Sequence, residues 1–250
     1  MCFELDSSPP IPAISGAAVS HRELELEAAD GNRFAAFAAE PDEPTGACVV
    51  ILPDVRGLYR FYEELALRFA ERGHRAIAID YFGRTAGVGK RGEDFEYREH
   101  VDQTTPEGIQ ADVGPAVEWL RGEGRRAIFT LGFCFGGHHS WLAAAGGHGL
   151  AGAIGFYGVP GARDGHPGPS QRARDMEAPI LALQAGADAH ITAEANAEFE
   201  RALETAGVEH ELVSYEGAPH SFFDRKQEDF AEASEDAWNR VLDFIARHTA

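Results

Sequence analysis

A cysteine set among glycines stands between an apolar run and a helical pattern, and this feature constrains the fold most. The segment Gly132-Phe133-Cys134-Phe135-Gly136-Gly137 follows the apolar run Ala127–Leu131 and precedes a helical pattern from about Gly136 to Ala145. A nucleophile on a tight strand-to-helix turn needs strained backbone angles, and side chains at the flanking glycine positions would collide with neighbouring structure. The pattern is G-x-S-x-G with cysteine in the serine position, so we predict Cys134 as a nucleophile. The alternative is a buried core cysteine beside a turn.

Strand-like and helix-like stretches alternate along the rest of the chain. Strands are expected at Ala47–Leu52, Arg75–Ile79, Ala127–Leu131, Leu150–Phe156, Pro179–Leu183 and His210–Val213, and helices at Tyr62–Glu71, Ile109–Leu120, Gly136–Ala145, Thr192–Thr205 and about Gln227–Arg247. This alternation predicts an α/β fold with a mostly parallel central sheet and helices on both faces. The continuous apolar character of several strands agrees with burial on both faces.

The N-terminal part has a different pattern. Apolar and charged residues alternate over Val19–Ala28, which favours an edge hairpin with Arg33–Ala39 and adds an antiparallel edge to the sheet. Residues 1–18 read as an irregular lead-in, and residues 19–250 as a single domain at the upper end of one-domain sizes. Residues 81–105 are rich in glycine and charged residues, so we expect a long connecting segment there rather than a compact one.

The formal net charge of −19 narrows the possible partners. It repels nucleic acid and anionic membranes, so we expect neither as a partner. It also repels small anionic substrates, and a local arginine must reverse the field if the substrate carries a carboxylate. There is no apolar run of membrane-spanning length and no secretory signal pattern, which favours a cytoplasmic protein. We expect a monomer.

The cysteine count agrees with a reducing compartment. Cys2, Cys48 and Cys134 are an odd number with no C-x-x-C pair and no metal-ligand spacing. We therefore expect no disulfide framework and no metal site.

An acid and a histidine follow the cysteine in the order that suits a catalytic triad. Asp188 comes after the predicted strand Pro179–Leu183, and His220 comes after the predicted strand at His210–Val213. A histidine here can accept the thiol proton and return it to the leaving group. The acid would fix the tautomer and orientation of the ring. Either residue alone is more often an ordinary loop residue, but the pair in this order makes a joint case.

These segments resemble the dienelactone hydrolase (carboxymethylenebutenolidase) family of the α/β-hydrolase superfamily. The resemblance covers most of residues 20–248 and rests on the G-x-C-x-G-G turn at Cys134, on Asp188, and on Gly217, His220 and Phe222 of a G-x-x-H-x-F segment. It implies cleavage of enol lactones or related esters through an acyl-enzyme on cysteine, without a cofactor.

The resemblance also implies roles for further residues. Asp54 stands where the family has a glutamate that interacts with the resting thiol, and the amides of Phe135 and Val55 would form the oxyanion hole. Arg84 would bind a substrate carboxylate, although a solvated loop charge is the alternative for this residue. Arg225 is the candidate for a second substrate-binding arginine, but it lies one place later than the family's pattern expects.

Several other residues are expected to have structural roles. We assign capping, packing or loop-shaping roles to His138, His139, His190 and Cys48. His166 lies in a loop rich in glycine and proline, no histidine pair has zinc-ligand spacing, and we expect Cys2 to be a bystander near the N-terminus. Tyr59, Tyr62 and Tyr81 are either pocket or core aromatics.

Two other functions remain open at this point. One is a general short-chain carboxylesterase or thioesterase on the same triad, which would prefer neutral esters. The other is a non-catalytic small-molecule-binding protein that reuses the fold, since fold alone does not determine function.

Overall fold

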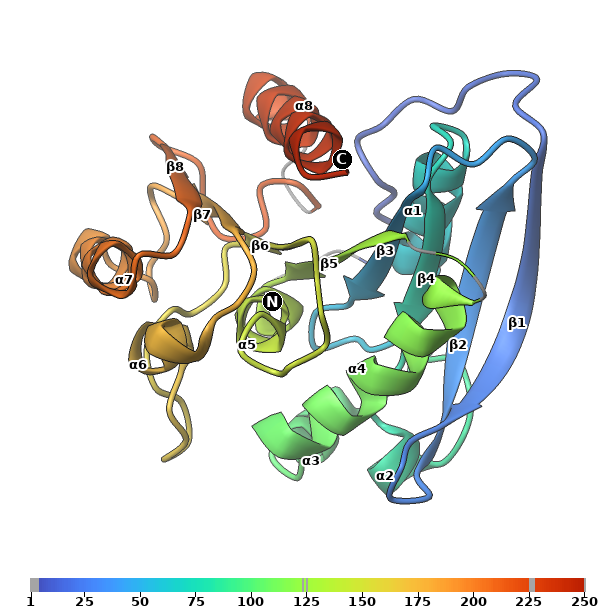
Figure 1. The fold of residues 1–250 in the computed structure, drawn as a ribbon, viewed down its shortest axis with the longest axis horizontal. Coiled ribbons are helices and arrows are strands. Elements are labelled where there is room, and N and C mark those ends of the chain that lie inside the picture. The colour runs from blue at the N-terminus through green and yellow to red at the C-terminus, as the bar shows by residue number, and fades with distance from the viewer. Residues whose placement is uncertain (1–4, 123, 125, 225–227, 250) are drawn as a thin grey trace.

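An eight-stranded, mostly parallel sheet runs through the middle of the protein in a computed structural model (Figure 1). The structure describes residues 5–122, 124, 126–224 and 228–249. The strands are β1 (Val19–Glu27), β2 (Arg33–Pro41), β3 (Ala47–Leu52), β4 (Arg75–Ile79), β5 (Ala127–Phe133), β6 (Gly152–Phe156), β7 (Ile180–Ala185) and β8 (His210–Tyr215). Their order is β1-β2-β4-β3-β5-β6-β7-β8, and β1 with β2 and β2 with β4 pair antiparallel. The predicted α/β fold with an antiparallel N-terminal edge is confirmed.

Helices cover both faces of this sheet (Figure 1). They are α1 (Arg60–Ala70), α2 (Gly83–Ala86), α3 (Tyr97–Val101), α4 (Pro106–Arg121), α5 (Phe135–Ala143), α6 (Pro169–Arg172), α7 (Ala193–Ala206) and α8 (Ala231–Arg247). Side chains of α1 and α8 pack in one core layer, and those of α4, α5 and α7 pack on the opposite face. The expected start of the last helix, Gln227, lies outside the described residues.

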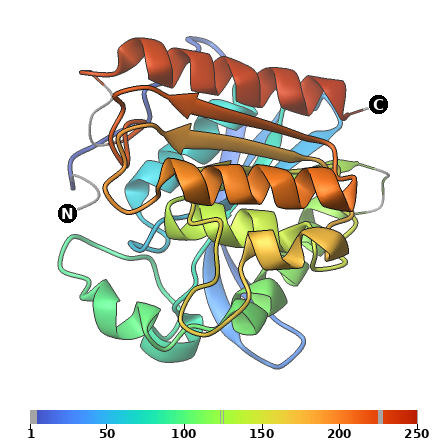
Figure 2. The same cartoon turned by 90° about the vertical axis from the view of Figure 1, so that its left-hand side faces the viewer.

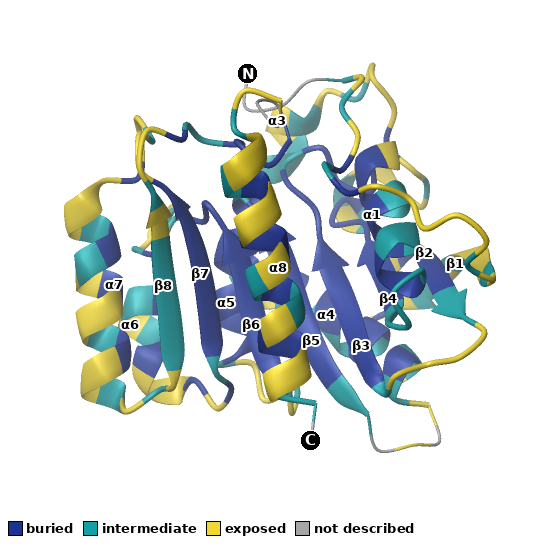
Figure 3. Ribbon diagram, turned by 90° about the horizontal axis from the view of Figure 1, so that it is seen from above, coloured by how far each residue is buried: buried dark blue, intermediate teal, exposed yellow. Residues whose placement is uncertain are grey.

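Burial explains why the inner strands have continuous apolar sequences. All six residues of β3 are buried, and so are the five of β6 and the six of β7, because helices cover both sides of them (Figure 3). The edge strand β1 instead alternates between half-buried and exposed positions over its second half. The predicted periodicities therefore reflect the place of each strand in the sheet.

Local signals set the ends of two helices that support the site. Thr105 and Thr192 precede α4 and α7, and each hydroxyl accepts a hydrogen bond from the amide three residues later. Pro106 occupies the first position of α4, where its fixed φ suits a helix start. Gly207 ends α7 in a left-handed conformation.

Residues 81–105 carry the short helices α2 and α3 and lie at the end of the molecule where β4 finishes (Figure 2). This end also holds the loops that follow β3, β5, β6, β7 and β8, because those strands run parallel to β4. Such a loop cluster is where α/β sheets place their ligands. No helix among the described residues is long and apolar enough to cross a membrane.

Candidate active site

Cys134 lies on the sharp turn between β5 and α5, with φ 54° and ψ −109°. A positive φ is unfavourable for a residue with a side chain and persists only where the surroundings fix it. The Cys134 amide donates to the carbonyl of Phe156 at 2.9 Å. A Cβ at Gly136 would lie 2.0 Å from the carbonyl oxygen of Leu52, and one at Gly132 would lie 2.0 Å from the carbonyl oxygen of Gly136. The glycines therefore have the steric cause that the sequence suggested.

His220 and Asp188 meet across the loops that follow β8 and β7. The Nδ1 atom of His220 lies 2.5 Å from Oδ2 of Asp188, whose side chain is completely buried. The other carboxylate oxygen accepts the amides of His190 at 2.8 Å and Ile191 at 3.2 Å. The acid is thus held by its own loop and faces the imidazole.

The environment of Asp188 determines which nitrogen of His220 carries the proton. Burial opposes ionisation, but hydrogen bonds from His220 and from the amides of His190 and Ile191 hold the pKa of Asp188 below its usual value. An ionised Asp188 requires the proton on Nδ1 of His220, which leaves Nε2 as an acceptor. In the described part of the chain this buried Nε2 meets no hydrogen-bond partner. Such an acceptor can serve as a general base.

Tyr157 is a neighbour of the site that the sequence analysis did not identify. Its ring centroid lies 5.0 Å from that of His220, and its backbone has φ 37°. Burial, together with nearby groups that include Asp224 and Cys134, raises the pKa of Tyr157 well above its usual value. The hydroxyl therefore remains protonated. The sequence could have indicated this residue, because Tyr157 directly follows the apolar strand β6 and so lies at the carboxyl end of the sheet.

The amide of Phe135, at the start of α5, and that of Val55, in the loop after β3, belong to adjacent segments. β3 and β5 pair in parallel as far as Leu52 and Gly132, so the segments that follow them start side by side. Among the residues described, neither amide donates a backbone–backbone hydrogen bond in a turn, loop or cap. Two such donors can stabilise an oxyanion next to Cys134.

Asp54 is buried, and its carboxylate binds Arg56. The amide and Nε of Arg56 donate to Oδ1 of Asp54 at 2.8 and 3.0 Å, and Nη2 lies 3.0 Å from Oδ2. Arg56 Nη2 also makes a short ion pair with Asp224, and all three residues are only 3% exposed. The Asp54 carboxylate therefore has a cationic partner that the sequence analysis did not anticipate.

One guanidinium thus serves two buried carboxylates. Burial raises the pKa of Asp224 to about 6, and nearby Asp54 adds to this rise while Arg56 opposes it. Burial acts against the charge of Arg56, but Asp54, Tyr62 and Asp224 raise the pKa of Arg56 above its usual value. Arg56 and Asp224 are 168 positions apart in the chain. The only indication of this ion pair in the sequence was that Arg56 lies close to Asp54 and Asp224 lies close to His220.

Arg84 is engaged by neighbouring acids. Its guanidinium forms a short ion pair with Asp30, lies 2.8 Å from Oδ1 of Asp112, and donates to the carbonyl of Gly108 at 3.2 Å. Asp112 is completely buried, and burial raises its pKa to about 6 although Arg84 and a hydrogen bond from Asn32 oppose this. Through these bonds, Arg84 of α2 is connected to the β1–β2 turn and to α4. The partners in these bonds do not belong to the loops that hold Cys134 and His220.

The other singled-out residues have varied surroundings. Arg225 and Cys2 lie outside the described residues. Cys48 is buried in β3, where burial raises the pKa of its thiol to about 11, whereas Cys134 is partly exposed. Tyr62 and Tyr81 are buried, with Tyr62 accepting the Asp54 amide and Tyr81 donating to the Pro53 carbonyl. The Tyr59 hydroxyl donates to the Leu5 carbonyl.

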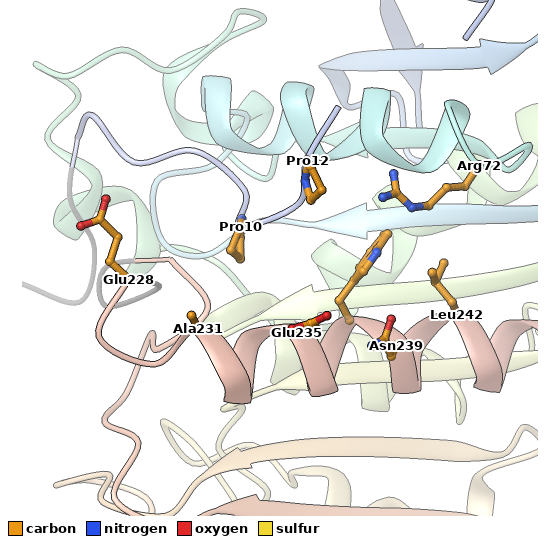
Figure 4. A pocket seen from close by; sticks show the side chains of 9 residues that line it. Pro10, Pro12, Arg72, Glu228, Ala231, Glu235, Asn239 and Leu242 are labelled. Atoms are coloured by element: carbon orange, nitrogen blue, oxygen red, sulfur yellow. The ribbon is translucent and has the colours of Figure 1, made fainter. Parts of the chain in front are cut away.

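A cavity of about 610 Å³ lies away from this site, between the N-terminal segment and α8 (Figure 4). Pro10 and Pro12 lie on one side of it, and Glu235 and Leu242 project from α8 on the other. Among the described residues that line it there is no cysteine, serine or histidine. No group of three His, Cys, Asp or Glu side chains arranged to hold a metal ion occurs within the described ranges.

Comparisons with known proteins identify the family and the fold of this chain. The model of the dienelactone hydrolase family matches residues 34–249. A carboxymethylenebutenolidase from Rhodococcus opacus is 29% identical over 259 residues, which cover 99% of this chain and 97% of that protein. The crystal structure of a Klebsiella pneumoniae protein assigned as a dienelactone hydrolase has a TM-score of 0.79 and 26% identity, and the match covers 92% of this chain and 99% of that one.

A third comparison concerns the fold alone. The crystal structure of a dienelactone hydrolase-like promiscuous phosphotriesterase from metagenomic libraries has a TM-score of 0.78 with 18% identity, covering 94% of this chain and all of that one. The matched family region runs from within β2 to the end of α8 and therefore includes the loops that hold Cys134, Asp188 and His220. This chain belongs to the dienelactone hydrolase family, a family of hydrolases with the α/β-hydrolase fold.

Proposed function

We propose that the protein is a cysteine hydrolase that cleaves an enol lactone or a related ester through an acyl-enzyme on Cys134. The observation that supports this most strongly is the His220–Asp188 pair, with Nδ1 and Oδ2 2.5 Å apart, at the end of the sheet where the Cys134 turn lies. A core cysteine would need neither the left-handed backbone nor an oriented base.

Each group has a defined step in the proposed reaction. Nε2 of His220 takes the thiol proton as the Cys134 sulfur attacks the carbonyl carbon, and the amides of Phe135 and Val55 stabilise the oxyanion. The intermediate collapses to a thioester, and His220 gives its proton to the leaving oxygen. A water molecule, deprotonated by His220, then attacks the thioester and releases the acid and the thiol. Asp188 keeps the imidazole oriented throughout.

The Rhodococcus opacus relative, a carboxymethylenebutenolidase, supports a lactone substrate. One observation supports the alternative of a general carboxylesterase or thioesterase. The guanidinium of Arg84, the residue expected to bind a substrate carboxylate, is already paired with Asp30 and Asp112. If no other cation served this purpose, neutral esters would be preferred.

Hydrolysis of dienelactone and of p-nitrophenyl acetate by the parent chain and by Cys134→Ala tests the proposal. We expect a much higher kcat/KM for dienelactone and no turnover of either compound by the variant. Turnover of the neutral ester alone would favour the general esterase. Undiminished activity of Cys134→Ala would refute the role of the cysteine, and the absence of any turnover by the parent chain would favour the non-catalytic binding protein.

The same proposal includes the domain organisation, the location and the oligomeric state of the protein. We propose that residues 19–250 form a single domain that acts as a cytoplasmic monomer, since a reactive thiol suits a reducing compartment. Only Ile14 and Val88 are exposed large hydrophobic residues in the described chain, which leaves no broad apolar face for a second copy. Size-exclusion chromatography with light scattering should give the mass of one chain.

A further inference from the structure

Residues 5–12, here called the N-terminal strap, pack against the segment that follows β3. The carbonyl of Leu5 accepts hydrogen bonds from the Tyr59 hydroxyl at 2.5 Å and from Nη2 of Arg60 at 2.7 Å. Further along the strap, Ile11 is 5% exposed and belongs to the core layer that contains α1 and α8. The strap is therefore attached to the domain near both of its ends.

Ser7, between these two attachments, reaches the buried ion pair of Arg56 and Asp224. Its Oγ lies 3.5 Å from Nη1 of Arg56. Burial raises the pKa of Asp224, whereas the charge of Arg56 and a hydrogen bond from Ser7 oppose this rise. One short polar side chain of the strap thus contacts both members of the ion pair.

The ion pair joins two loops that carry proposed catalytic groups. Arg56 directly follows Val55, whose amide is one of the two proposed oxyanion donors. Asp224 lies in the loop between β8 and α8, which also carries His220. The side chains of Arg56 and Asp224 are each only 3% exposed, and the two residues are 168 positions apart in the chain. Their contact is therefore a buried long-range link between the two loops.

Local hydrogen bonds connect this link to the backbone of each loop. Oδ1 of Asp54 accepts the Arg56 amide at 2.8 Å, which closes a turn around Val55. In the other loop, the Asp224 amide donates at 3.1 Å to the carbonyl of Ser221, the residue after the proposed base. A shift of either charged side chain would therefore move the oxyanion donor relative to the imidazole.

The relative position of these groups matters because the reaction depends on their geometry. A misplacement of about 1 Å can lower a rate by about a hundredfold. Water weakens an ion pair that it reaches, and a buried charge without its partner is costly. Ser7 is partly exposed and contacts the ion pair, so the strap separates the pair from solvent on this side.

We propose that the N-terminal strap is a positioning element: through Ser7 it holds Arg56 against Asp224, and this ion pair fixes the two catalytic loops relative to each other. The inference rests on the proposed function, in which the Val55 amide and His220 act in one reaction. The matched family region begins within β2, so the strap lies outside it. The strap thus supports the catalytic loops from outside the matched region.

The test combines hydrolysis of p-nitrophenyl acetate with urea denaturation, both at pH 7, for four variants. Ser7→Ala removes the hydroxyl without a change in charge, and Ser7→Thr keeps a hydroxyl. Asp224→Asn weakens the link because it removes one charge of the ion pair. Ser15→Ala is the matched control, since Ser15 is exposed in the same N-terminal part of the chain.

We expect Ser7→Ala to lower kcat about threefold to tenfold, as for the loss of one hydrogen bond, with KM close to that of the parent. Ser7→Thr should restore most of kcat, and Ser15→Ala should match the parent. Asp224→Asn should lower kcat about tenfold or more, although the loss of its buried charge raises the free energy of unfolding. This opposite change in activity and stability separates positioning from a purely structural role. A kcat of Ser7→Ala within about twofold of the parent, or an equal loss in Ser15→Ala, would overturn the proposal.

Alkylation of Cys134 by iodoacetamide at pH 7, followed by mass spectrometry of the peptide that contains it, needs no hydrolysis. A displaced His220 accepts the thiol proton less well, so Ser7→Ala should react more slowly than the parent, and Ser7→Thr at the rate of the parent. Absence of turnover in the parent would refute the proposed hydrolysis. Equal alkylation rates in the parent and Ser7→Ala would instead refute the role of the strap.

Discussion

Replacement of Asp224 by asparagine should change how the stability of the protein depends on pH. Asp224 and Asp54 are buried and share the guanidinium of Arg56, so the folded protein holds one carboxylate more than the cluster can neutralise. Burial, followed by the effect of Asp54, raises the pKa of Asp224 from 3.8 to about 6 despite Arg56. Because folding raises this pKa, the folded state binds more protons than the unfolded state between these two values.

The sign and size of the effect follow from this difference. Stability falls as the pH rises from about 4 to about 6, and above that range the cost of ionising Asp224 is fully present. The difference between the two pKa values corresponds to a loss of up to about 3 kcal/mol in the free energy of unfolding. Asparagine resembles the protonated acid and does not titrate. Asp224→Asn should therefore unfold with a free energy up to about 3 kcal/mol higher at pH 7, and with little gain at pH 4.

Urea denaturation followed by circular dichroism between pH 4 and pH 7.5 measures this dependence. Asp236→Asn is a suitable control because hydrogen bonds from Arg240 and Tyr215 lower the pKa of Asp236 against the effect of burial. Asp236→Asn should therefore slightly lower the free energy of unfolding at neutral pH, whereas Asp224→Asn should raise it. Equal pH slopes for the parent and Asp224→Asn, or a loss of stability in that variant at pH 7, would refute the reasoning.

Two further substitutions test the catalytic geometry. Asp188→Asn should leave the fold intact and lower kcat by about four orders of magnitude, since an amide no longer favours the Nδ1 proton on His220; kcat within tenfold of the parent would contradict this role. Gly136→Ala should destabilise the protein by about 1–3 kcal/mol or more, because the new Cβ would lie 2.0 Å from the Leu52 carbonyl oxygen. Gly161→Ala, where a Cβ meets nothing within 4 Å, is its matched control, and equal melting temperatures for the two variants would argue against the steric account.

Sequence patterns were informative wherever local chemistry sets the structure. The apolar run Ala47–Leu52 became a strand buried on both faces, and the alternating segment from Val19 became the edge strand β1. The glycines around Cys134 predicted a turn whose close contacts the structure contains. In each case the signal lay within a few residues of the feature.

The electrostatic surroundings of the site could not be predicted in the same way. Arg56 meets Asp224 only because the loops after β3 and β8 converge, and no spacing in the chain records that meeting. The partners of Arg84 likewise come from the β1–β2 turn and from α4. A pattern identifies a charged residue near a motif, whereas its role depends on which long-range partner neutralises it.

The proposed acyl-enzyme is best tested by mass spectrometry of the intact protein, quenched during hydrolysis of p-nitrophenyl acetate. The account predicts a population heavier by one acetyl group, with the modification on the peptide that contains Cys134 and absent from Cys134→Ala. Turnover with the acetyl group on another residue, or turnover that persists in Cys134→Ala, would contradict the account.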